Sequence, residues 1–214
     1  MACAVMRVSS GYPTLLLVLA SQAVGCRDDD SLTPERIADE QAVYLAVVDL
    51  LFHREIFDPL SNTHRYPERV VIRKATRIAN NPGGWGGDSL EHYVRGLLPE
   101  DVPESLADDY LKVNRSVQSL EDYTGLQKNI SFVDNDTFRL IFSEFGGWEY
   151  FYRHYENSNG LFELSRVAFD RKRNMALVYV GHYCGFMCGH GEFLLLTRVD
   201  RTWKVVREYS VWIT

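Results

Sequence analysis

Apolar residues recur at helical spacing in the stretch that starts at Pro34. One face is traced by positions that are all apolar except Gln41: Ile37, Gln41, Tyr44, Val48 and Leu51. Thr33 can accept a hydrogen bond at the start of a helix, and a proline fits the first helical position. The pattern therefore predicts an amphipathic helix over residues 34–53, packed against the rest of the domain.

The last third of the chain has the clearest strand pattern. Apolar, β-branched and aromatic residues fill segments 162–169, 175–183, 192–199 and 203–213, with turn-rich connections between them. Short gaps favour antiparallel hairpins. Residues 176–180 and 193–196 are apolar on both faces, which is typical of central strands covered on both sides. The predicted class is α+β: a C-terminal antiparallel β-meander of about four bent strands, packed with N-terminal and central helices.

The middle of the chain mixes helices, strands and loops. Its predicted elements are a loop at 61–64, a strand at 68–78, a glycine-rich loop at 80–87, helices at 89–98 and 104–113, a strand at 129–133, and an aromatic helix from Gly147 that ends at 157–160. Residues 137–142 are compatible with either a strand or a helix. These elements place helices between the N-terminal helix and the meander.

Composition narrows the class of protein. The chain has 214 residues, of which 46% are hydrophobic, as expected for one globular domain with its own core. Its net charge is −6, and no basic stripe follows any predicted element. Nucleic-acid binding requires a clustered positive surface, so no nucleic-acid partner is expected.

The N-terminus has the outline of a secretory signal peptide. The apolar run at 15–20 is far shorter than the roughly 20 residues that span a bilayer, and small residues close it before Cys26. A short buried helix is the alternative, but the charged residues at 27–30 argue against its continuation. We expect a signal peptide at 1–25, a polar tether at 26–33 and a single α+β domain at 34–214.

The four residues Ala23, Val24, Gly25 and Cys26 resemble the lipobox of bacterial lipoproteins. That pattern prefers leucine where this chain has Ala23, so a plain cleavage site before Cys26 stays open. The resemblance implies that the leader is removed and that Cys26 carries lipid. The domain would then be exported and held at a membrane, in the periplasm or at the cell surface.

Residues 199–206 have a polar turn before Trp203. This segment resembles the closing hairpin of cystatin-like and nuclear-transport-factor-2-like folds. The resemblance covers only these few residues. It implies a long N-terminal helix packed on a bent antiparallel sheet, and it implies no activity.

Four side chains cluster in one predicted hairpin: His182, Cys184, Cys188 and His190. A disulfide, two free thiols and a zinc site all fit these residue types. All four groups would come from one tight hairpin, which leaves little freedom for a metal tetrahedron. A disulfide would instead fix the register of the hairpin. The two-residue spacing of redox motifs is absent, so the favoured interpretation is a structural disulfide between Cys184 and Cys188.

Residues Gly87, Asp88, Ser89 and Leu90 spell the nucleophile motif of the GDSL hydrolases. In that family the serine follows an apolar strand, and a late Asp-x-x-His supplies the base. Here a glycine-rich loop precedes the serine, and the C-terminal third has no Asp-x-x-His. Since a serine without a base is a weak nucleophile, Ser89 is predicted to cap a helix.

No complete catalytic constellation is present in the sequence, and no cofactor is expected. The favoured function is therefore binding or structural, with a protein or small-molecule partner that the sequence does not identify. One alternative is an enzyme with a pocket between sheet and helices that uses Glu149, His154 or His182. The other is a metal-binding hairpin module. His154 is expected in the core, and Asp108 and Asp109 on a solvated face.

Overall fold

The computed structural model describes residues 33–58, 63–77, 90–98, 100, 102–123, 126 and 129–214. These residues belong to one compact unit, Ser31–Thr214. The predictions for the signal peptide, Cys26, the glycine-rich loop and Ser89 lie outside the described residues. None of the helices in the described ranges is long and apolar enough to cross a membrane.

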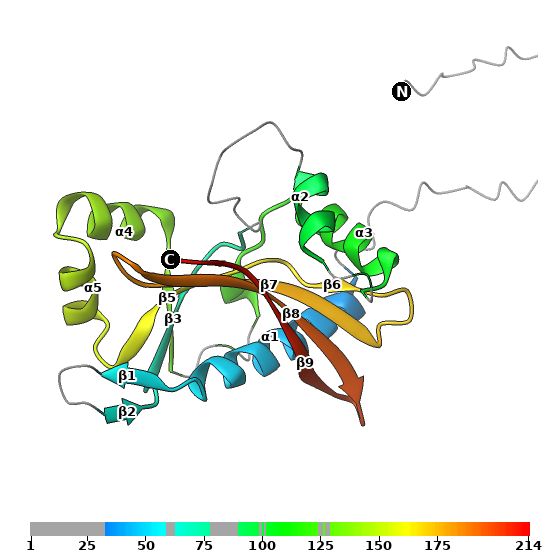
Figure 1. The fold of residues 1–214 in the computed structure, drawn as a ribbon, viewed down its shortest axis with the longest axis horizontal. Helices are drawn as coiled ribbons and strands as arrows, with labels where there is room; N and C mark the ends of the chain where they lie inside the picture. The colour runs from blue at the N-terminus through cyan, green and yellow to red at the C-terminus, as the bar shows by residue number, and fades with distance from the viewer. Residues whose placement is uncertain are drawn as a thin grey trace, which may run out of the picture. The chain divides into compact units, whose positions relative to one another are not determined.

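Most helices of the described chain precede Ser158, and the five strands β5 to β9 follow one another after it (Figure 1). The helices are α1 (Pro34–Phe52), α2 (Leu90–Leu97), α3 (Glu104–Val113), the 3-10 turn η2 (Leu120–Asp122), α4 (Asn135–Arg139), the π-helical segment η4 (Leu140–Glu144) and α5 (Trp148–His154). The strands are β1 (Ile56–Asp58), β2 (Thr63–Arg65), β3 (Arg69–Arg73), β4 (Ile130–Val133), β5 (Ser158–Leu164), β6 (Ala168–Phe169), β7 (Met175–Gly185), β8 (Cys188–Val199) and β9 (Thr202–Ile213).

Seven of the described strands form one sheet, in the order β4-β3-β5-β7-β8-β9, with β6 paired to β7. The neighbours from β5 to β9 pair antiparallel, which confirms the predicted C-terminal meander and the α+β class. The sheet continues beyond the meander, because β3 pairs parallel with both β4 and β5. This parallel extension was not predicted.

Helices cover both faces of the sheet (Figure 1). On one face α1 buries Val43, Val47 and Leu51 against strand residues such as Phe162 and Val178. On the other face, two helical groups pack: α2 and α3 lie over β7 and β8, and η4 and α5 lie over β3 and β5. Because both faces are buried, the central strands lack the polar alternation of a sheet with one wet face.

Local sequence signals placed several elements correctly. Thr33 accepts a hydrogen bond from the backbone N–H of Arg36 at 3.3 Å, so α1 begins with the predicted cap. Residues 137–142 are helical and belong to α4 and η4. The strand predicted at 68–78 is shorter, since β3 ends at Arg73. The short hairpin β1–β2 was missed, and the predicted loop at 61–64 is partly wrong, because β2 begins at Thr63.

A buried ionic network joins α1 to α3 and to the segment between β5 and β6. Glu40 Oε1 accepts from Arg36 Nε at 3.2 Å and from Arg166 Nη2 at 3.0 Å, and Tyr123 donates to Glu40 Oε2. Arg36 also donates to Asp109 Oδ2 at 2.8 Å. The prediction that Asp109 lies on a solvated face was therefore wrong. Its partner Arg36 stands 73 residues away in the sequence, so no local pattern indicated the pair.

Candidate functional site

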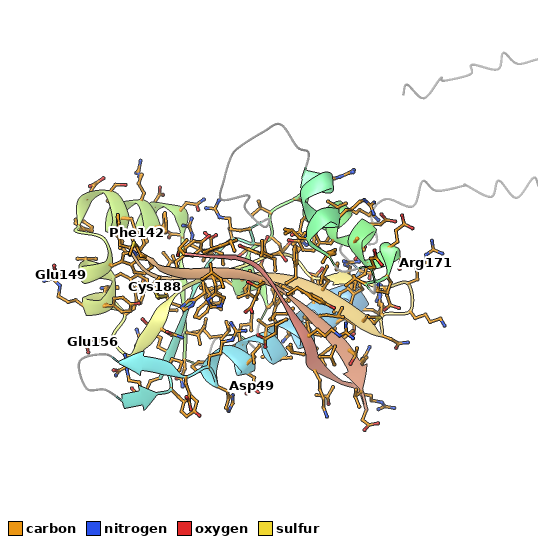
Figure 2. All side chains as sticks on the ribbon, viewed as in Figure 1. Asp49, Phe142, Glu149, Glu156, Arg171 and Cys188 are labelled. Carbon is orange, nitrogen blue, oxygen red and sulfur yellow. A yellow bond between two sulfur atoms is a disulfide. The ribbon has the colours of Figure 1, made fainter. Side chains whose placement is uncertain are left out.

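The hairpin between β7 and β8 ends in a covalent loop. Cys184 and Cys188 form the predicted disulfide, with their Cα atoms 5.1 Å apart. Since both sulfurs are used in this bond, the alternatives of free thiols and of a zinc site built from His182, Cys184, Cys188 and His190 do not fit this structure. Figure 2 labels Cys188 at the end of the hairpin, beside α4 and α5.

Contacts from neighbouring segments brace the base of this loop. Tyr152 on α5 donates to the carbonyl of Cys184 at 2.8 Å, and the backbone N–H of Thr214 donates to the carbonyl of Gly189 at 3.0 Å. On β5, Gly160 has a φ of +99°, and a Cβ there would lie 2.9 Å from the Cα of Cys184. Only glycine allows β5 to approach the hairpin so closely.

Two large apolar side chains stand at the tip of the loop. Phe186 is 97% exposed and Met187 is 79% exposed. They lie between the two bonded cysteines, so the disulfide restricts the backbone that carries them. A rigid turn that presents an uncovered phenylalanine and methionine is unusual, since a soluble surface seldom places adjacent large apolar groups in full contact with water.

On the α1 side of the sheet, the two histidines of the hairpin face each other in register. Their ring centroids are 5.1 Å apart, and the ring of His182 stacks on Phe162 at 4.4 Å. The Nε2 atom of His182 contacts the carbonyl of Asn159. Burial lowers the pKa of His182 to about 4, so this imidazole is neutral at physiological pH.

Arg54, just after α1, lies among the charged groups of the same face. Its Nη1 is 2.5 Å from Glu192 Oε1 and 3.1 Å from His190 Nε2, and its Nη2 is 3.1 Å from Glu208 Oε2. Burial raises the pKa of Glu192, but hydrogen bonds from His190 and Arg54 outweigh it and leave this pKa below its usual value. A permanent guanidinium at this place disfavours a metal cation, and no described group of three or more His, Cys, Asp or Glu residues is arranged to hold one.

On the opposite side of the sheet, Glu163 is a second buried titratable group. Its nearest donors are Tyr183 Oη at 3.4 Å, Arg77 Nε at 3.9 Å and Arg73 Nη1 at 4.0 Å. Both arginines instead bond Asn135 Oδ1, at 2.6 Å from Arg73 and 3.1 Å from Arg77. Burial raises the pKa of Glu163, because the surrounding cations do not contact the carboxylate closely enough to offset the loss of water.

A carboxyl with a raised pKa can transfer protons, but proton transfer alone does not define a reaction. Within the described ranges, no serine, threonine or cysteine is hydrogen-bonded to a histidine as a nucleophile would be. Glu149 and His154 are exposed on α5, on a different element from His182, so the prediction that His154 lies in the core was wrong. The structure does not bring together the residues proposed for an enzyme.

Sequence reasoning missed several residues of this region, although some of them are of a residue type that is unusual for their place in the sequence. Glu163 is a single acid within an apolar strand, and Arg73 is a charged residue in a β-branched strand. Phe186 and Met187 are large apolar residues at a turn, where polar residues are the rule. Arg54 carried no signal, since its partners stand 136 or more residues away.

Comparisons with known proteins do not assign the chain to a family. No protein family, curated protein or solved structure matches it.

Proposed function

We propose that the chain is an exported, lipid-anchored bacterial domain that binds a partner and does not catalyse a reaction. The observation that carries this proposal is the disulfide-closed hairpin with its exposed tip. Disulfides persist in oxidising compartments and are rare in the cytosol, so Cys184 and Cys188 agree with the signal peptide expected before Cys26. The lipid would be attached to Cys26, and the domain would lie in the periplasm or at the cell surface.

A binding role is supported by how the interior and the surface differ. The interior between helices and sheet is filled with apolar side chains on both faces. The buried charges around Glu40 hold α1, α3 and the segment before β6 together, which is a structural task. By contrast, Phe186 and Met187 contribute nothing to the core, so a partner outside the domain is the best explanation for them.

The lipid anchor is tested by growing cells that express the full chain with labelled palmitate. We expect the label in the unaltered protein and in the Cys3→Ser variant, because Cys3 leaves with the signal peptide. The Cys26→Ser variant should carry no label. Label that persists in Cys26→Ser, or a processed protein without any label, would contradict the anchor.

A further inference from the structure

We infer that the groove between α1 and β9 binds a single alkyl chain that carries an anionic head group, such as a fatty acid monomer. The inference goes beyond the proposed function and does not depend on it, because it rests on described residues of the domain alone. The groove shares no lining residue with the hairpin tip, so it is a second and separate binding site.

The groove lies where α1 runs beside the first residues of β9 (Figure 1). Its volume of about 550 Å³ is in the range of small-molecule sites. The helical wall is one stripe of residues spaced three or four apart, and the strand wall runs from Arg201 to Val205. The core-facing residues of α1, such as Val43 and Val47, lie on a neighbouring stripe, so the groove is outside the core. The residues of the helical wall are Ala42, Leu45, Ala46, Asp49, Leu50 and His53.

The middle of the groove is apolar. Ala42, Ala46 and Leu50 are partly buried beside the core, and Leu45 is 41% exposed. Trp203 lines the opposite wall. From Ala42 to Leu50 the helix rises about 12 Å, so the apolar wall is elongated. An extended alkyl chain fits this shape better than a compact ring system does.

The charges of the groove favour an anionic head group. Arg201 and Lys204 on the strand wall are exposed, and neither forms an ion pair within the part of the protein that the structure describes. Arg198, at the end of β8, is already paired with Asp39 at 3.2 Å. The one carboxylate of the groove is Asp49, on the helical wall. An anionic head group therefore meets two available cations on the strand wall, and a cationic head group would meet their repulsion.

Trp203 adds a hydrogen-bond donor that lacks an acceptor. The residue is 4% exposed, and its buried Nε1 atom has no hydrogen-bond partner within the described ranges. Its ring packs beside Phe169, with the centroids 5.6 Å apart, and beside the guanidinium of Arg198. A buried donor without an acceptor is costly, so an oxygen of a head group at this wall would supply the missing partner.

A bilayer surface fits these observations less well than a single alkyl chain does. A bilayer contacts residues that protrude from a protein, whereas the apolar residues of this groove other than Leu45 are partly or fully buried. A concave wall between a helix and a strand admits one alkyl chain from the side and excludes a flat surface.

The test uses the full protein with Cys26→Ser, so that no lipid attached to that residue competes for the groove. Isothermal titration calorimetry measures the binding of decanoate at concentrations where it is monomeric. We expect one decanoate per protein. Hexanoate should bind about tenfold more weakly or worse, because it buries less apolar surface, and decyltrimethylammonium should lose a similar factor through its charge. In an NMR spectrum the indole N–H signal of Trp203, identified with Trp203→Phe, should move with decanoate, while that of Trp148 on α5 should not.

Two double variants separate the groove from general surface charge. Arg201→Asn with Lys204→Gln should weaken decanoate binding about tenfold, and asparagine tolerates the φ of +66° at position 201. The matched control is Arg171→Gln with Lys172→Gln, which removes the same charge from the neighbouring exposed turn before β7. This control should leave the affinity unchanged.

Two single variants test the apolar wall. Ala46→Phe should fill the groove and abolish decanoate binding, with the fold checked by circular dichroism. If Ala46→Phe does not fold, Leu45→Gln takes its place, since Leu45 is already exposed and its replacement should weaken binding about fivefold.

Absence of decanoate binding, equal binding of decyltrimethylammonium, or equal losses in the two double variants would overturn the proposal. So would an unchanged signal of Trp203 at saturation. Sedimentation with phosphatidylglycerol vesicles distinguishes a membrane lipid from a free alkyl chain. A protein that binds these vesicles through Arg201 and Lys204 but does not bind decanoate would also contradict the inference.

Discussion

Arg166 on the segment after β5 and Glu40 on α1 form an ion pair in the interior, with Nη2 and Oε1 3.0 Å apart. Their side chains are 2% and 1% exposed, and 126 residues separate them in the sequence. Arg36 and Tyr123 also bond Glu40, so one carboxylate connects three segments. A buried charge is tolerated only where its partners are in place, so this pair fixes how α1 sits on the sheet.

Replacing Glu40 by glutamine should lower the free energy of unfolding by about 3 kcal/mol or more, because the buried guanidinium groups of Arg36 and Arg166 would lose the negative charge that they share, even though Arg36 keeps its pair with Asp109. Urea unfolding followed by circular dichroism measures the change. The matched control is Glu35→Gln on the same helix, which is exposed and should change stability by less than about 0.5 kcal/mol. Equal effects of the two substitutions would show that the Glu40 pair does not stabilise the fold.

Glu163 should behave differently from Glu40. Its closest guanidinium nitrogens are 3.9 and 4.0 Å away, and burial raises its pKa, so its charged form is poorly compensated. Glu163→Gln removes the cost of burying the charge and should change stability at pH 7 by no more than about 1 kcal/mol. The same urea experiment checks this value. A loss as large as that of Glu40→Gln would mean that Glu163 pairs closely with Arg73 in solution.

The Cys184–Cys188 disulfide should contribute about 2 kcal/mol to stability, since it closes a very short loop in the unfolded chain. The double variant Cys184→Ser with Cys188→Ser should lose this amount in urea unfolding without a reductant. The variant also serves as the control for the reductant. Adding a reductant should destabilise the unaltered protein and leave the stability of the variant unchanged. Identical unfolding of the unaltered protein with and without reductant would contradict the prediction.

His182 should make the fold less stable in mild acid. Burial lowers its folded pKa to about 4 from an ordinary 6.5, so between these values the unfolded chain binds a proton that the folded chain does not. The free energy of unfolding therefore rises with pH across this window, and up to about 3 kcal/mol is lost as the pH falls through it. Unfolding measured from pH 4 to 7 should show a smaller slope for His182→Gln.

The control for this pH dependence is His53→Gln, since the His53 side chain is 71% exposed. Its slope should match that of the unaltered protein. If His182→Gln kept the full slope, the acid sensitivity would come from other groups of the same face, such as Glu192.

Gly191 should not tolerate a side chain. A Cβ at this position would lie 2.5 Å from Tyr179 Oη and still closer to the indole of Trp212, which donates to Tyr179 Oη at 2.8 Å. Gly191→Ala should therefore cost about 2 kcal/mol, through displacement of packed rings. Gly96→Ala on α2 has no atom within 4 Å of its Cβ and should be neutral or slightly stabilising. Thermal unfolding of both variants provides the comparison.

Local patterns were sufficient for the elements that depend on neighbouring residues. Thr33 caps α1 as predicted, and Tyr44, Val48 and Leu51 of its predicted apolar face are buried, whereas Ile37 is 39% exposed. Helix α3 has the bounds that its sequence predicts. The disulfide was predicted correctly because the predicted export and the spacing of Cys184 and Cys188 pointed to the same bond.

Features that depend on distant residues were not predictable from one sequence. The parallel pairing of β3 with β5 joins Val71 to Leu161, and nothing near either strand specifies that partner. The same holds for Asp109, which sequence alone placed in water and which bonds Arg36 across 73 residues. In the candidate site, the histidine pair followed from strand register, whereas Arg54 and Glu163 depended on tertiary contacts.

We propose that this domain works outside the cytoplasm, with Cys184 and Cys188 joined across a hairpin. The most direct measurement is to quench cells that express the full chain with acid, alkylate the protein without a reductant, and determine its mass and modified peptides. We predict a chain without its leader, in which neither Cys184 nor Cys188 carries an alkyl group. A chain that retains residues 1–25 and is alkylated at both cysteines would contradict the account.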